Sequence, residues 1–157
     1  MRPVSATLIA CALIPLSLSV SACDPHTVTD ASRQIYCEVM PDAPQRNSDA
    51  APTRVLGKVR YRCDRPGAAT MTLTINLQRQ NKAGAWINVA GTSFTARGEQ
   101  TVGTQDEKFR TREISAACSA GTFRMYVKGS SSARGATKTY DRPGPKAFNP
   151  CQPRFFA

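Results

Sequence analysis

Apolar and polar residues alternate along much of the chain, as is typical of β-strands that bury one face. The clearest case is residues 70–80, where Met, Leu and Ile alternate with Thr, Asn and Gln. Residues 55–63 repeat the pattern, with Val and Tyr on one face and Lys58, Arg60 and Arg62 on the other. Further strands are expected at residues 33–40, 85–90, 93–96, 99–104, 108–116, 121–128 and 136–141.

Turn-forming residues separate these runs. Residues 81–84 predict a hairpin turn, whereas the loop at 41–54 is too long for a tight hairpin. Residues 129–135 predict a flexible hairpin tip, and the proline-rich tail at 142–153 is expected to lie extended across the body. Helical periodicity is almost absent, apart from one helical turn at 115–120. The sequence therefore predicts an all-β, immunoglobulin-like sandwich of about seven to eight antiparallel strands.

The N-terminal segment has a different pattern. Arg2 precedes an apolar run that Pro15 interrupts and that ends in small residues, as in an export signal. The run is shorter than the roughly 20 residues that cross a bilayer, so a retained transmembrane helix is the weaker interpretation. We predict a signal peptide at 1–22, a polar tether at 23–32 and the sandwich domain at 33–157.

The end of this segment, Val20-Ser21-Ala22-Cys23, resembles the lipobox of bacterial lipoproteins. In that family the Cys thiol receives a diacylglyceryl group and becomes the mature N-terminus. The resemblance implies an exported protein that is lipid-anchored through Cys23 to the outer face of the cytoplasmic membrane. In an organism with an outer membrane, Asp24 resembles the family's inner-membrane retention signal. The alternative is cleavage after Ala22 by a signal peptidase that leaves no lipid.

The cysteine count favours the lipid. The chain has six Cys, and Cys11 lies in the predicted signal, so an odd number remains in the mature chain. Lipidation of Cys23 leaves four Cys for two disulfides in an oxidising compartment. Three pairings are possible. We favour Cys37 with Cys63 and Cys118 with Cys151, which would tie neighbouring strands and pin the tail to the body.

The mature part also carries a loose layout, C…G-x-V…C-D, then L-x-x-Q…G-x-W, then C-x-x-G-x-x-R…C. This layout resembles small secreted proteins of actinobacteria that have two disulfides and no assigned activity. The resemblance supports the fold and implies nothing about function.

Groups suited to catalysis are sparse. The single His, His26, lies in the tether, so a Ser-His-Asp or Cys-His arrangement has no base. The sequence has no nucleotide-binding, zinc or redox motif, so we predict no cofactor and no metal. A carboxylate pair like that of a glycosidase stays open, and its candidates are Glu99, Asp106, Glu107 and Glu113. Acidic residues in loops between strands are usually solvated, so we expect that the chain is not an enzyme.

Positive charge is in excess. The net charge is +10, and removal of Arg2 with the signal leaves +9. Many cations occupy alternate positions on three predicted strands, and they would form a basic plate if those strands shared one sheet. The alternative is a solvated face of a basic protein. Phe109 leaves it ambiguous which face of the second strand is buried. The candidate anion- or partner-binding residues are Lys58, Arg60, Arg62, Lys108, Arg110, Arg112, Arg124 and Lys128.

These features predict a binding module rather than a catalyst. Besides the membrane, the expected partner is an envelope protein or an anionic wall polymer. Nucleic acid is a poor candidate, because the aromatic residues are few and mostly on the predicted inner faces. The alternative function is a phage- or mobile-element-encoded lipoprotein that blocks DNA entry or inhibits a wall enzyme.

Overall fold

The computed structural model describes residues 35–104 and 108–152. The predicted signal, the tether and Cys23 lie outside these residues. Within the described part, no helix is long and apolar enough to cross a membrane.

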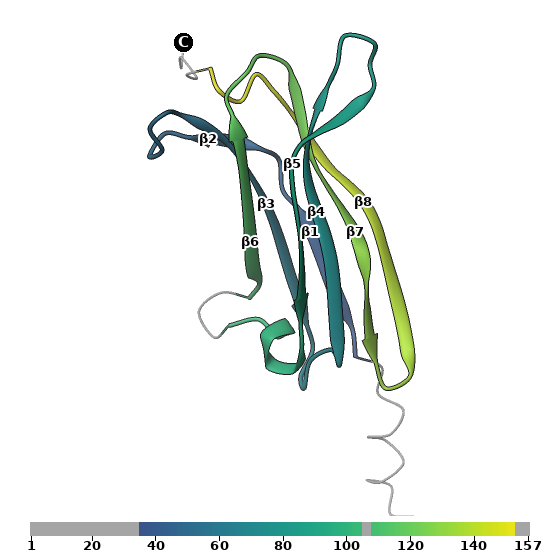
Figure 1. Cartoon of the computed structure of the whole chain (residues 1–157). Helices are drawn as coiled ribbons and strands as arrows, with labels where there is room; N and C mark the ends of the chain where they lie inside the picture. The colour runs from purple at the N-terminus through teal and green to yellow at the C-terminus, as the bar shows by residue number, and fades with distance from the viewer. Residues whose placement is uncertain (1–34, 105–107, 153–157) are drawn as a thin grey trace, which may run out of the picture. The chain divides into compact units, whose positions relative to one another are not determined.

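Within these residues, eight strands form two antiparallel sheets, and the predicted immunoglobulin-like sandwich is confirmed. Figure 1 shows how the strands are arranged. In sheet A, the central strand β3 pairs with β6 along one edge and with β1 and β2, one after the other, along the opposite edge. Sheet B has the order β5-β4-β7-β8. The strands of sheet A are β1 (Cys37–Pro41), β2 (Gln45–Asn47), β3 (Arg54–Cys63) and β6 (Arg110–Ala117), and those of sheet B are β4 (Thr70–Gln80), β5 (Trp86–Ala96), β7 (Thr122–Ala133) and β8 (Ala136–Phe148).

The core lies between the sheets and follows the predicted alternation. Every second residue of β3 from Val55 to Cys63 is buried, and β4 buries Met71, Leu73, Ile75 and Leu77. At Gly57 a Cβ atom would collide with Met125 of the opposite sheet, so the missing side chain makes room for a large one.

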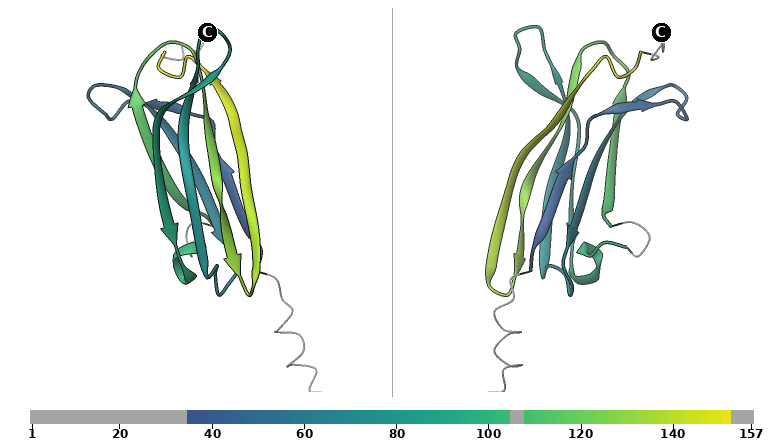
Figure 2. Two further views of the ribbon diagram at one scale, coloured as in Figure 1. Left: turned by 45° about the vertical axis from the view of Figure 1, so that its right-hand side comes forward. Right: turned by 180° about the vertical axis from the view of Figure 1, so that it is seen from behind.

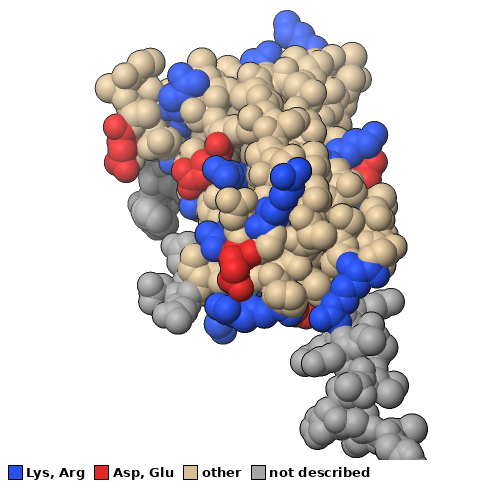
Figure 3. Space-filling model, turned by 60° about the horizontal axis from the view of Figure 1, so that its bottom comes forward, with Lys and Arg blue, Asp and Glu red and all other residues tan. Residues whose placement is uncertain are grey.

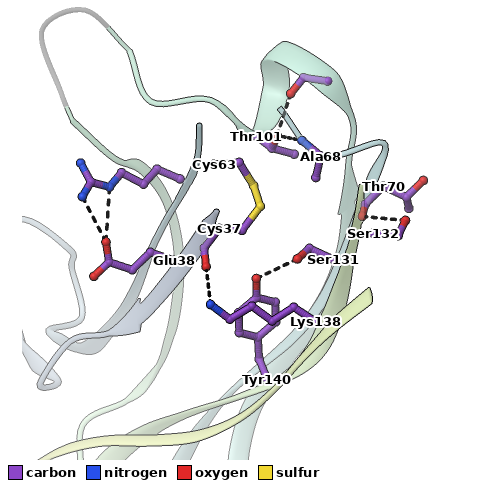
Figure 4. Close-up of a disulfide and its surroundings, with 12 residues drawn as sticks. Cys37, Glu38, Cys63, Ala68, Thr70, Thr101, Ser131, Ser132, Lys138 and Tyr140 are labelled. Carbon is purple, nitrogen blue, oxygen red and sulfur yellow. Dashed lines mark hydrogen bonds and ion pairs between the residues drawn. A yellow bond between two sulfur atoms is a disulfide. The ribbon is translucent and has the colours of Figure 1, made fainter. Parts of the chain in front are cut away.

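The two predicted disulfides are confirmed. Cys37 and Cys63 are directly opposite each other on β1 and β3, so their bond lies within sheet A (Figure 4). Cys118 follows β6 and Cys151 follows β8, so their bond joins one end of sheet A to the same end of sheet B. Such crosslinks stabilise a small domain mainly by restricting the unfolded chain.

Residues 99–104 were expected to form a strand, and this prediction is wrong. The structure has a 3₁₀ helix there, η2 (Gly98–Thr101). Thr101 is fully buried, and its Oγ1 donates to the carbonyl of Gly98 and accepts from the backbone N–H of Ala68, at 2.7 and 2.9 Å. These two bonds satisfy the buried hydroxyl of Thr101 locally, so it needs no hydrogen-bond partner from a neighbouring sheet.

The two strands expected at 85–90 and 93–96 are one strand, β5. Gly91 lies within this strand and does not interrupt it. Its missing side chain makes room for the side chain of Asn76, which lies opposite on β4. The loop predicted at 41–54 contains the short strand β2, which the sequence pattern did not reveal.

The expected hairpin tip and tail are more regular than predicted. β7 continues to Ala133, and the turn is confined to Arg134 and Gly135, which both have positive φ as a two-residue hairpin turn requires. β8 then pairs with β7 as far as Phe148, with an irregularity near Pro143 and Pro145. The tail is thus extended as expected, but most of it is an edge strand of sheet B.

Candidate functional site

The outer face of sheet A carries Lys58, Arg60 and Arg62, as predicted. Each of these cations is paired with a carboxylate on a neighbouring strand or loop. Lys58 Nζ lies 3.0 Å from Glu113, Arg60 lies 2.7 Å from Asp42, and Arg62 lies 3.2 Å from Glu38. The hydrogen bond that Arg60 donates to the carboxylate of Asp42 raises the pKa of Arg60 above its ordinary value. This face is therefore a row of ion pairs rather than an uncompensated basic plate.

The cations of the strand predicted at 108–116 do not join that face. Arg110 and Arg112 lie opposite Tyr61 and Val59, which are inner-face positions. Arg110 donates to the carbonyls of Val102 and Glu99 at 2.7 and 2.9 Å, so it fastens η2. The guanidinium carbon of Arg112 lies 5.0 Å from the ring centroid of Phe94.

Phe109 takes the outer face instead, where the guanidinium of Arg62 lies 4.4 Å from its ring centroid. Lys108 is exposed and precedes β6. The expectation that Lys108, Arg110 and Arg112 continue the basic face of β3 is wrong, because the buried phase of β6 is the opposite one.

The third pair, Arg124 and Lys128, lies on the outer face of sheet B, so a single basic plate of all three strands does not form. Between them, Tyr126 donates a 2.6 Å hydrogen bond to Asp141, and this bond raises the pKa of Tyr126. Lys128 is exposed and lies opposite Asp141 in the register of β7 and β8.

Arg124 belongs to a cluster of side chains that spans all four strands of sheet B. Its Nε donates to Gln78 at 2.9 Å, and Gln78 in turn donates to Asn88 at 2.9 Å. The guanidinium lies 4.1 Å from the ring centroid of Trp86, and the ammonium of Lys146 lies 5.8 Å from the same centroid. We call Gln78, Trp86, Arg124 and Lys146 the Trp86 cluster.

The cluster holds Arg124 in one orientation. Gln78 is only 9% exposed, and both ends of its amide are hydrogen-bonded. The hydrogen bond of the Arg124 side chain to a described residue uses Nε, and its terminal NH groups make none within the described part of the chain. Among the ion pairs of residues 35–104 and 108–152, none involves Arg124 or Lys146. A guanidinium in this state offers a bidentate fork to a phosphate or carboxylate.

A groove adjoins the cluster at the same end of the sandwich. It has a volume of about 660 Å³ and separates the β1–β2 loop and β2 from the end of β8 and the segment that follows. Lys146 belongs both to the groove and to the Trp86 cluster. Figure 2 shows that β2 and the end of β8 lie at the end of the sandwich opposite the β7–β8 turn.

Sequence analysis missed three members of this cluster. Gln78 was placed on the polar face of its strand, but its partner was unknown. Lys146 was assigned to the extended proline-rich tail, outside any predicted strand. Trp86 faces outward because the pairing of β4 with β5 shifts between Leu77 and Gln78, which puts Trp86 opposite Gln80. A residue skipped in one strand turns the following side chains to the other face.

The comparisons with known proteins add no assignment, because no protein-family model and no curated protein matches the chain. Among the described residues, no group of three or more His, Cys, Asp or Glu could hold a metal ion.

Proposed function

We propose that the chain is an exported lipoprotein, anchored through Cys23 to the outer face of the cytoplasmic membrane, and that its sandwich is a non-enzymatic binding module. The binding surface is the Trp86 cluster on the outer face of sheet B, and the ligand carries negative charge. The partner is an anionic wall polymer or an acidic region of an envelope protein.

The disulfides support the export part of the proposal. Two disulfides in a small domain are typical of oxidising compartments outside the cytosol. They use four of the five Cys that follow the predicted signal, and Cys23 is the one that remains. A thiol left over in an exported chain needs a role, and acylation at the lipobox-like sequence supplies one.

The orientation of Arg124 carries the binding part. A cation that binds an anion well is held in place before the ligand arrives, because less side-chain entropy is then lost on binding. Gln78 and Trp86 hold Arg124 in this way, whereas Lys58, Arg60 and Arg62 of β3 already have carboxylate partners. Of the predicted candidate residues, Arg124 is therefore the one best prepared for an external anion.

The position of the cluster is compatible with an anchor. The described chain begins next to β1, and Lys138 near the start of β8 donates to the carbonyl of Cys37 at 2.9 Å. Lys146 lies eight residues further along β8, which is roughly 25 Å of strand. A ligand at the cluster would thus be held away from the end at which the chain enters the domain.

The anchor is tested by intact-mass analysis of the protein extracted from membranes and by fractionation of a Cys23→Ala variant. We expect an acylated mature N-terminus at residue 23 and release of the variant from the membrane fraction. An unmodified residue 23 in the membrane-bound protein would contradict the anchor and leave the binding surface untouched.

The binding surface is tested by crosslinking the chain in its native envelope and comparing two variants. Arg124→Ala is expected to lose captured material, and Arg60→Ala serves as the matched control from the opposite sheet. The single Trp of the chain lies in the cluster, so its fluorescence reports directly on ligand binding to purified protein. Equal capture by wild type and Arg124→Ala would contradict this surface.

A further inference from the structure

The groove beside the Trp86 cluster has features that a point contact with an anion does not need. It is lined by apolar, amide and cationic side chains in close succession, and Lys146 joins it to the cluster. Phe148 is 76% exposed, although an aromatic ring of this size is usually covered. The six lining residues that matter here are Pro44, Gln45, Arg46, Lys146, Phe148 and Asn149.

Three cations lie along this end of the sandwich, and the acidic residue Asp49 follows in the loop after β2. Arg124, Lys146 and Arg46 lie on β7, β8 and β2, and Lys146 borders both the groove and the Trp86 cluster. None of the three takes part in an ion pair with a described residue. A ligand with negative charges at intervals would complement this series better than a single anion.

The opposite end of the sandwich has a different charge pattern. Figure 3 shows that end, where acidic side chains are interspersed among Lys and Arg. Arg65 there pairs with Glu99 at 3.3 Å, and Arg62 pairs with Glu38. An anionic ligand is therefore favoured at the groove end rather than at the end where the described chain begins.

The groove is better suited to a hydroxylated chain than to a peptide. An extended peptide binds a sheet edge through consecutive backbone N–H and C=O groups. Pro143 and Pro145 in β8 and Pro44 and Pro150 in the groove remove N–H donors at these positions. The groove instead offers side-chain amides, which hydrogen-bond hydroxyl groups, and an exposed ring that packs against C–H surfaces.

We propose that the groove and the Trp86 cluster form one continuous site for an anionic, hydroxyl-rich polymer of the kind found in cell walls. Arg124, Lys146 and Arg46 bind successive charged groups. Gln45 and Asn149 bind hydroxyls, and Phe148 packs against the polymer backbone. This inference rests on the proposed binding function and specifies its ligand class.

The ligand class is tested by titrating the disulfide-bonded full chain with four purified polymers and following Trp86 fluorescence and heat of binding. Poly(glycerol phosphate) supplies phosphate with hydroxyls, polygalacturonate supplies carboxylate with hydroxyls, polyglutamate supplies charge on a peptide, and dextran supplies hydroxyls alone. We expect one or both of the first two to bind, and their ratio identifies phosphate or carboxylate as the charged group. Dextran should not bind, and polyglutamate should bind at least about tenfold more weakly. Equal or tighter binding of polyglutamate would overturn the inference.

The extent of the site is tested with groove variants. Arg46→Ala should weaken binding of the preferred polymer about tenfold, and Phe148→Ala about fivefold. Arg65→Ala and Tyr36→Ala are matched controls, because they remove an exposed Arg and an exposed aromatic ring from the opposite end. Circular dichroism and thermal unfolding confirm that each variant is folded.

The outcomes separate the two proposals. If Arg124→Ala loses polymer binding while Arg46→Ala and Phe148→Ala bind like wild type, the groove is not part of the site and the proposed surface stands. If none of these variants differs from wild type, both proposals fail.

Discussion

The outer faces of the two sheets use basic residues in opposite ways. On sheet A, Lys58, Arg60 and Arg62 of β3 pair with Glu113, Asp42 and Glu38 from neighbouring strands and loops. On sheet B, Arg124 and Lys146 lie against Trp86, and no described carboxylate pairs with them. Strands with similar alternation of basic residues thus form a self-neutralised face in one sheet and a cationic one in the other.

The difference shows that the charge of a strand does not determine the charge of its face. Cross-strand neighbours determine it, because opposite charges on directly facing residues attract and lower the local potential. Exposed ion pairs of this kind add little stability, about 0 to 1 kcal/mol each. Their effect here is to remove an anion-binding surface that β3 alone would present.

The largest expected effect comes from removing the disulfide that joins the two sheets. A Cys118→Ser/Cys151→Ser variant should lose about 4 kcal/mol of unfolding free energy, because a bond that closes a separation of 33 residues is removed. Chemical denaturation measures the loss. The Cys37→Ser/Cys63→Ser control should lose a similar amount, but polymer binding should weaken only in the first variant, whose bond holds the segment beside the groove. Equal loss of binding in both variants would contradict this distinction.

The next largest effect is expected from substitutions that leave the cations of sheet A without carboxylate partners, as in sheet B. Neutralising Glu38, Asp42 and Glu113 as Glu38→Gln, Asp42→Asn and Glu113→Gln leaves three cations without partners. If each free cation strengthens attraction to an anionic surface about fivefold, affinity for anionic vesicles should rise about a hundredfold. Vesicle sedimentation at low and high salt checks this, and added salt should abolish the gain. An unchanged affinity would mean that the ion pairs do not control the charge of this face.

A smaller effect should follow when sheet B loses the residue that orients Arg124. Gln78→Leu keeps the volume of the side chain and removes both of its hydrogen bonds, so only the contact with Trp86 still orients Arg124. Affinity for an anionic ligand should fall about tenfold, while stability changes by about 1 kcal/mol or less. The control is Thr74→Val on the same strand as Gln78, which removes an outward hydrogen bond to Ser93 of β5. Trp86 fluorescence titration distinguishes the two, and equal affinities would exclude an orienting role for Gln78.

The smallest effect concerns alkaline pH. Burial raises the pKa of Tyr140 on β8, so the folded protein favours its neutral form. The unfolded chain therefore loses this proton at lower pH than the folded chain, and unfolding free energy should decline above about pH 10. Tyr140→Phe should show a shallower decline in urea titrations at increasing pH. The same slope in both proteins would contradict the assignment.

The parts of the fold that depend on local pattern were predictable. Period-two alternation placed the buried residues of β3 and β4 correctly, because each strand has one face in the core. The sequence left three disulfide pairings open, and the favoured one, which ties neighbouring strands and pins the tail, is confirmed. Gly91 misled the prediction of β5, since its role is to accommodate Asn76 rather than to end a strand.

The parts of the site that depend on register were not predictable. Glu38 and Glu113 are far from Arg62 and Lys58 in sequence, and only the pairing of β1, β3 and β6 brings them together. Trp86 reaches the outer face through a one-residue shift within a hairpin. A sequence pattern identifies the faces of a strand, but it does not identify what lies beside each face.

The edge strands also affect how copies of this chain behave at high local concentration. β8 contains Pro143 and Pro145, and β6 turns Arg110 and Arg112 toward the interior. A strand from a second molecule would meet missing N–H donors if it paired with β8, and two cationic side chains if it paired with β6. Such edges do not template fibres, so crowded domains resist aggregation at these two edges.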